Sequence, residues 1–140
     1  MKLQKVYSSG KILNGNLYSR LQDLDKSVFY GCGNEFKENR DWWVIVDRNK
    51  IVAYCGSAYA YGGVCLFVRA WVHEPYRGKG IQKRMIKCRV KAAYGCKVIV
   101  TYTLRDNYPS MNSLVSCGFR MFEPEYAYAG RQQMYFRMIL

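Results

Sequence analysis

Apolar side chains recur along this chain with two different periods, and each change of period predicts a new element. Helical spacing covers residues 14–30, where Leu17, Leu21, Leu24 and Val28 share one face. Asn16 is a candidate cap for this predicted helix, and the glycine-containing segment 31–34 ends it. A second helix is predicted over residues 81–92, before Gly95, because its apolar positions follow the stripe of a helix face. These positions are Ile81, Met85, Cys88 and Ala92.

Strand-forming residues fill three segments between the two helices: 42–46, 51–55 with an extension to residue 61, and 64–72. A polar turn over residues 47–50 and the glycine pair at 62–63 connect them, which predicts an antiparallel meander. The third strand is long and apolar, interrupted by Arg69.

The rest of the chain completes a mixed sheet. Residues 98–102 are β-branched and predict a buried strand parallel to the one before it. Pro109 suits the first turn of a third helix, which Gly118 ends, and residues 134–140 alternate as a final strand. The first ten residues add an edge strand. The order predicts one α/β domain over residues 1–140, with a mixed, mostly antiparallel central sheet flanked by helices.

Composition narrows the class of protein. Half of the 140 residues are apolar, which excludes general disorder. No apolar run approaches the ~20 residues of a membrane helix, and the N-terminus does not resemble a secretion signal. We therefore expect a cytoplasmic protein without a membrane partner, either a monomer or a homodimer.

Charge points to an anionic partner. The chain carries 22 Lys and Arg against 10 Asp and Glu, a net charge of +12. Seven basic residues and no acidic one lie in the segment 77–91. This balance favours nucleic acid, a phosphorylated cofactor or an acidic surface, and it disfavours a site for polycations.

The six cysteines and the single histidine, His73, do not predict a metal site. No two cysteines form a C-x-x-C pair, and most stand among apolar neighbours. We interpret them as small core residues, and we expect neither a metal nor a disulfide framework.

The segment 71–82 carries the clearest chemical signal. A predicted strand runs into a glycine-bearing loop, and the loop opens a helix. Glycines let the backbone pass close to a ligand, and the free N–H groups of a helix start attract phosphate. The segment therefore predicts a pyrophosphate cradle, whereas the plainer interpretation is a polar turn before a solvated basic helix. It matches neither the nucleotide P-loop nor the dinucleotide fingerprint.

This loop resembles that of the GNAT family, the Gcn5-related N-acetyltransferases, which reads R/Q-x-x-G-x-G/A. Five of its six positions fit, and Gln82 departs from Gly or Ala. Val72 matches the family's strand ending in Val-x-Pro, with Pro75 one place late. A second family pattern, an Asn followed by a small residue and then Gly-Phe, is met by Asn107, Ser110, Gly118 and Phe119. The resemblance covers about residues 42–140.

The resemblance implies acetyl-CoA as co-substrate. It implies that backbone amides hold the pyrophosphate over Arg77, Gly78, Lys79, Gly80, Ile81 and Gln82. Trp71 and Val72 would pair with the pantetheine arm, and Asn107 would hydrogen-bond it. Lys83 and Arg84 would meet the 3′-phosphate, and the helix start near Ser110 would stabilise the thiolate. The alternatives are that Asn107 caps a helix and that Lys83 and Arg84 are solvated.

The catalytic groups are less sharply predicted. The family's usual general-acid tyrosine is replaced by Leu114, which leaves Tyr108 as a displaced acid. His73 and Glu74 are candidate bases because they follow the reactive strand. A strand-bulge N–H near Val72 is the expected oxyanion donor. Further candidates for an acceptor groove are Glu35, Glu38, Asp41, Tyr126 and Tyr128.

Two functions follow from these observations. The first is acetyl transfer from acetyl-CoA to a primary amine, protein or small molecule, by direct attack in a ternary complex. The alternative is a catalytically weak or inactive GNAT-fold module whose basic surface binds nucleic acid or an acidic protein. We expect only weak, non-specific nucleic-acid binding, because no row of aromatic residues for base stacking accompanies the lysines.

Overall fold

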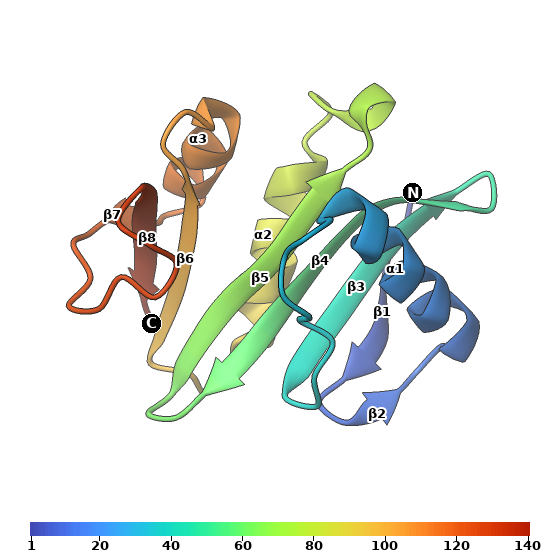
Figure 1. Cartoon of the computed structure of the whole chain (residues 1–140), viewed down its shortest axis with the longest axis horizontal. Helices are drawn as coiled ribbons and strands as arrows, with labels where there is room; N and C mark the ends of the chain where they lie inside the picture. Colours follow the sequence, from blue (N-terminus) through green and yellow to red (C-terminus); the bar gives the residue numbers. More distant parts are fainter.

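An eight-stranded mixed sheet in the order β2-β1-β3-β4-β5-β6-β8-β7 forms the centre of the protein (Figure 1). The structure is a computed structural model that describes residues 1–140. The strands are β1 Leu3–Ser8, β2 Lys11–Ile12, β3 Arg40–Asp47, β4 Lys50–Ala60, β5 Val64–Val72, β6 Val98–Leu104, β7 Arg120–Met121 and β8 Gln133–Ile139. The helices are α1 Gly15–Val28, α2 Ile81–Ala92 and α3 Tyr108–Ser116, with a 3₁₀ turn, η1, over Glu74–Tyr76.

The predicted topology is confirmed. β3, β4 and β5 form the antiparallel meander, and β5 and β6 are the one parallel pair. Helix α1 covers one face of the sheet, while α2 and α3 pack on the other (Figure 1). No helix in the structure is long and apolar enough to cross a membrane.

The period-2 pattern of β3 separates two layers of core. Trp42 and Val44 pack with Leu21 on the α1 side, whereas Trp43 and Ile45 pack with Met85 on the α2 side. The predicted stripe of α2 lies in the second layer. A third cluster joins α2 and α3 to β6 and β8. Because both faces of the sheet are covered, its central strands are apolar on both sides.

Two details at the N-terminal end differ from the predictions. The cap of α1 is Asn14 rather than Asn16, because the helix begins at Gly15 and the Asn14 side chain accepts from the Leu17 N–H at 3.1 Å. Asn16 lies inside the first turn, where its side chain accepts from Arg20. The first residues form β1 as expected, but β2 covers its outer side and is the edge strand.

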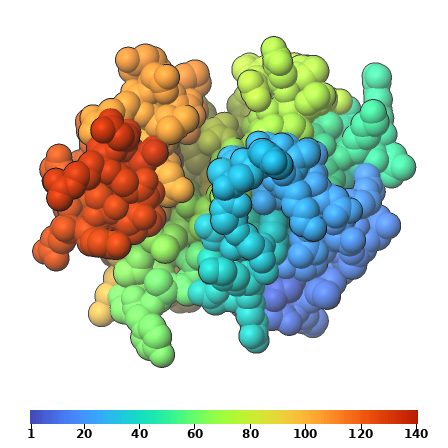
Figure 2. All heavy atoms as spheres, in the orientation of Figure 1, coloured from blue at the N-terminus to red at the C-terminus, as the bar shows by residue number.

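β5 and β6 diverge soon after they meet. They pair only from Val64 to Leu66 on β5, and beyond this point the β6-facing edge of β5 has no strand partner. The starts of α2 and α3 stand at the open end (Figure 1). The space-filling view shows a recess there, between the orange C-terminal part and the green and cyan segments (Figure 2).

Candidate functional site

The loop between β5 and α2 presents an open helix start. Gly78 and Gly80 have φ values of +76° and +80°, and a Cβ built at either would meet no atom within 4 Å. Gly80 caps α2 without a side-chain hydrogen bond, and the first α-helical bond of α2 is from the Arg84 N–H to the Gly80 carbonyl. The N–H groups of residues 81–83 therefore make no hydrogen bond within the protein, which leaves them free to bind an anion.

Contacts with the sheet hold this loop in place. The Arg77 side chain donates to the Val72 carbonyl at 2.8 Å, and the His73 N–H donates to the Val52 carbonyl at 2.8 Å. The Tyr76 hydroxyl donates to Asp47, the last residue of β3, and this hydrogen bond raises the pKa of Tyr76. The cradle is thus anchored at the end of the hairpin.

The basic side chains around the loop differ in whether they already bind another group of the protein. Arg77, Lys79 and Lys83 are exposed, and none of them forms an ion pair. Arg84 donates to the Met1 carbonyl at 2.9 Å, so its guanidinium is engaged with the N-terminus. Gln82 is half-buried at the second position of α2. Lys79 and Lys83 are therefore the free cations nearest the helix start.

Asn107 occupies the equivalent place before α3. Its side-chain oxygen accepts from the Ser110 N–H at 3.3 Å, which makes it the N-cap of that helix. The capping alternative is therefore realised. The side-chain NH₂ group of this exposed residue makes no hydrogen bond within the protein, so it can still donate to a ligand.

The residues considered for catalysis take three kinds of position. His73 and Glu74 are exposed at the start of η1, and the His73 ring lies 5.7 Å from that of the half-buried Trp71. Tyr108 is 65% exposed in the first turn of α3. Leu114 is 3% exposed and packs in the cluster shared by α2 and α3. The position of the family's usual acid is thus filled by a core side chain.

The strand bulge lies three residues before the position predicted for it. β5 shifts register against β4 so that Cys55 pairs with Ala70 but Gly56 pairs with Val68, which leaves Arg69 as the extra residue. Val72, where we expected the oxyanion donor, pairs regularly with Ala53. The position of a bulge depends on how two strands are aligned, and this alignment cannot be read from the sequence of one strand. The charge of Arg69 inside an apolar strand was the available signal.

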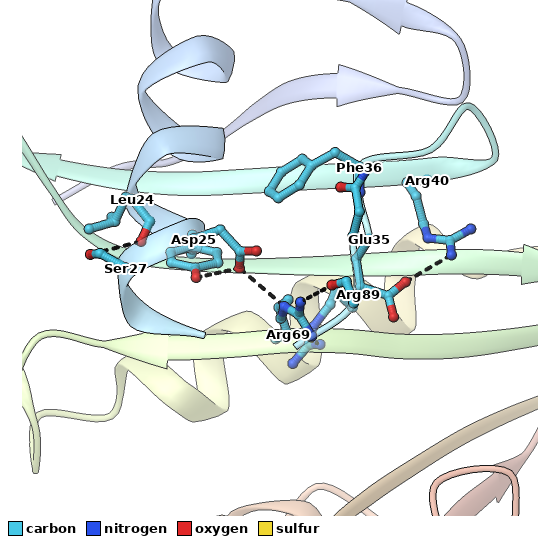
Figure 3. Close-up of polar contacts among 11 residues, drawn as sticks. Leu24, Asp25, Ser27, Glu35, Phe36, Arg40, Arg69 and Arg89 are labelled. Atoms are coloured by element: carbon cyan, nitrogen blue, oxygen red, sulfur yellow. Dashed lines mark hydrogen bonds and ion pairs between the residues drawn. The ribbon is translucent and has the colours of Figure 1, made fainter. Parts of the chain in front are cut away.

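A buried network surrounds this bulge. Arg69 has a φ of +42°, and its side chain donates to Asp25 on α1 at 3.1 Å and to the Gly33 carbonyl (Figure 3). The Tyr54 hydroxyl donates to the same Asp25 oxygen at 2.7 Å. Burial, followed by this hydrogen bond, raises the pKa of Tyr54. The network fixes the segment after α1 to the centre of the sheet.

Two tyrosines and a carboxylate from distant parts of the sequence lie near one another. The rings of Tyr102 on β6 and Tyr128 in the β7–β8 loop meet edge to face at 5.8 Å. Burial raises the pKa of both hydroxyls, and the charge of Glu35 adds to the rise in each. Glu35 follows α1 and pairs with Arg40 at 2.8 Å (Figure 3). Side chains from three segments that are distant in the sequence therefore approach one another.

The other acceptor-groove candidates lie elsewhere. Asp41 is buried and bound by Lys5, Ser9 and Tyr59, which is a structural role. Glu38 stands against Gly10 in the β1–β2 turn. Tyr126 lines a separate pocket of about 850 Å³ with Glu123 and Arg131. All six cysteines are free thiols, and no group of three His, Cys, Asp or Glu side chains is placed to hold a metal.

Comparison with known proteins agrees with this geometry. The family model described as "Acetyltransferase (GNAT) family" matches residues 10–119. No curated protein sequence matches the chain. Among solved structures, NAA60 of Arabidopsis thaliana in complex with a bisubstrate analogue is 17% identical, with a TM-score of 0.71 over 99% of this chain and 98% of that chain. The fold is therefore similar although the sequences have diverged.

Two bacterial structures give the same result. An acetyltransferase of Bacillus subtilis in complex with CoA is 18% identical, with a TM-score of 0.66 over 99% of each chain. The aminoglycoside 6'-N-acetyltransferase from Enterococcus faecium is 14% identical, with a TM-score of 0.73 over 99% of this chain and 97% of that chain. At these identities the likeness concerns the fold.

Proposed function

This chain belongs to the GNAT family of acetyltransferases, and from that premise we propose that it transfers the acetyl group of acetyl-CoA to a primary amine by direct attack in a ternary complex. The observation that carries the proposal is the uncapped start of α2, with its two left-handed glycines and free cations. A protein that only bound macromolecules would have no use for a phosphate cradle at the mouth of a recess.

We infer that acetyl-CoA lies across the open end of the sheet. The amides of residues 78–82 bind the pyrophosphate, whereas the predicted Arg77 amide is not free, because its N–H donates to the Glu74 carbonyl at 3.1 Å. Lys79 and Lys83 add charge beside the pyrophosphate. The pantetheine arm runs along the unpaired edge of β5, including the backbone of Trp71 and Val72, as an added strand would. The free NH₂ group of Asn107 reaches it from the other wall.

The proposed reaction uses groups at the end of β5 and at the starts of α2 and α3. The neutral amine attacks the thioester carbonyl carbon, and a backbone N–H of the β5 bulge stabilises the oxyanion. The C–S bond then breaks, CoA leaves as the thiolate, and the surplus proton of the amine passes to a base. The candidate bases are His73 and Glu74, which are exposed after the end of β5, and Glu35, whose charge helps to raise the pKa of Tyr102 on β6.

Departure of the thiolate relies on the start of α3. The helix dipole near Ser110 favours negative charge there, and Tyr108 is the nearest phenol hydroxyl along the chain. We assign the larger part of the thiolate stabilisation to the helix dipole, because the Tyr108 side chain is exposed and no hydrogen bond orients it. Its hydroxyl remains the alternative acid.

The proposal is tested with the wild-type protein and acetyl-CoA labelled in the acetyl group. Calorimetry measures binding, and mass spectrometry measures label transferred to a panel of peptides with free N-termini, lysine peptides and small amines. We expect saturable binding and transfer to at least one class, with stoichiometric CoA release. Binding without transfer to any acceptor would favour the inactive module, and absence of binding would reject the proposal.

The exposed face of α2 supports a second candidate function. Lys83, Lys87 and Lys91 are exposed on it, and the helix carries no acidic residue. Such a surface attracts nucleic acid or an acidic protein without reading a sequence. We expect weak binding to duplex DNA that falls steeply with salt, whereas salt-resistant binding to one sequence would reverse our ranking of the two functions.

A further inference from the structure

Arg89 is a buried cation without a carboxylate partner. It is 2% exposed on α2, and none of the three ion pairs of the structure includes it. Burial lowers its pKa, and its guanidinium lies 4.0 Å from the centre of the Phe67 ring. Burying a charge without a counter-ion is costly, so the bonds that Arg89 does make are of interest.

Those bonds converge on the β5 bulge. One terminal nitrogen of Arg89 donates to the Gly56 carbonyl at 3.2 Å and to the Arg69 carbonyl at 3.5 Å. Gly56 lies on β4 at the register shift, and Arg69 is the extra residue of β5. The Arg89 Nε–H donates to the Met85 carbonyl at 3.2 Å, which fixes the guanidinium relative to α2.

The bulge is thus held from both faces of the sheet. On the α1 face, Asp25 binds the Arg69 side chain (Figure 3). The Gly33 carbonyl also accepts from this side chain, which lies over the Phe29 ring. On the α2 face, Arg89 binds the Arg69 carbonyl. A φ of +42° is unfavourable for a residue with a Cβ and persists only where surrounding contacts enforce it.

We propose that Arg89 is a positioning residue, whose guanidinium orients the bulge peptides so that a backbone N–H meets the oxyanion of the thioester. This inference rests on the proposed acetyl transfer. An oxyanion donor acts only when it lies ~2.7–3.1 Å from the developing charge. Arg89 touches neither substrate, so its effect passes through the backbone of β4 and β5.

Two substitutions test this role. Arg89→Met keeps much of the side-chain volume and removes the donors, whereas Arg89→Lys keeps the charge with a single nitrogen. Lys26→Met, at an exposed position of α1 that has no part in the proposed site, is the control. We expect kcat to fall about 100-fold in Arg89→Met and about tenfold in Arg89→Lys, with the affinity for acetyl-CoA within threefold of wild type. Lys26→Met should retain wild-type kcat.

A spectroscopic measurement separates this inference from the proposed function. We expect Arg89→Lys to shift the ¹⁵N–¹H resonances of Arg69 and Ala70 while those of the α2 start, residues 81–83, stay in place. This measurement needs no acceptor, so it decides the positioning of the bulge even if no substrate is turned over. Unchanged bulge resonances, or an unchanged kcat in folded Arg89→Lys and Arg89→Met, would overturn the inference. An equal loss of kcat and acetyl-CoA affinity would also overturn it.

Discussion

The starts of α2 and α3 stand at the same end of the sheet, each after one strand of the parallel pair, yet they are built differently. α2 begins at a left-handed glycine with no side-chain cap, whereas Asn107 caps α3 and Pro109 fills its first turn. Both helices direct the positive end of a dipole to this end of the sheet, but only α2 leaves its first N–H groups free and has cations beside them. The start of α2 can therefore hydrogen-bond an anion, whereas the capped start of α3 acts on a negative charge only through its dipole.

The largest expected effect is at the uncapped start. Gly80→Glu places a carboxylate and a Cβ where the phosphate is expected, so we expect acetyl-CoA affinity to fall by at least about 100-fold in calorimetry. Gly62→Glu is the matched control, because Gly62 has nearly the same φ, +79° against +80°, equally open surroundings and a remote place in the β4–β5 turn. Equal affinities in the two variants would contradict the phosphate cradle.

The second effect concerns the inner side of α3. Leu114→Tyr must push an aromatic ring into the cluster formed with Ile86 and Phe119, so we expect it to lower the free energy of unfolding by about 1–3 kcal/mol. We expect no gain in CoA release. Val115→Tyr, at the neighbouring exposed position, should leave urea unfolding unchanged. A Leu114→Tyr variant with wild-type stability and faster CoA release would show that this position opens toward the thioester.

A third, smaller effect separates the two roles of Asn107. Asn107→Ala removes the cap of α3, so we expect a loss of about 1 kcal/mol of stability and a less than tenfold loss of acetyl-CoA affinity. Asn107→Ser keeps a capping oxygen but lacks the NH₂ group. It should therefore unfold at the wild-type urea concentration while showing the same reduced affinity in calorimetry. If Asn107→Ser binds acetyl-CoA as tightly as wild type, Asn107 is only a cap.

The smallest effect is expected at Tyr108. If the dipole of α3 carries the thiolate, Tyr108→Phe lowers kcat by less than tenfold and leaves acetyl-CoA affinity unchanged. A general acid contributes ~10²–10⁴ in rate, so a loss of that size would make Tyr108 the acid. Steady-state CoA release at saturating acetyl-CoA distinguishes the two cases.

The contrast between the two helix starts was readable from the sequence because both depend on local spacing. The stripe of α2 and the pattern from Asn107 to Phe119 each lie within about one helix, and the structure places them as the sequence predicted. The bulge at Arg69 and the burial of Arg89 depend instead on strand register and on α2 having two buried sides. For that reason Arg89 counted in the sequence only as one of the seven basic residues of segment 77–91, and its burial was not predicted.

The brief pairing of β5 with β6 also has a mechanical consequence. Three register pairs join these strands, whereas seven join β6 to β8. Under tension between the two termini, the sheet should therefore part first along the β5–β6 seam, with β6, α3, β7 and β8 peeling away as a unit. A ligand bound between β5 and β6 would add contacts across this gap. Single-molecule pulling should then record a higher rupture force with acetyl-CoA than without it.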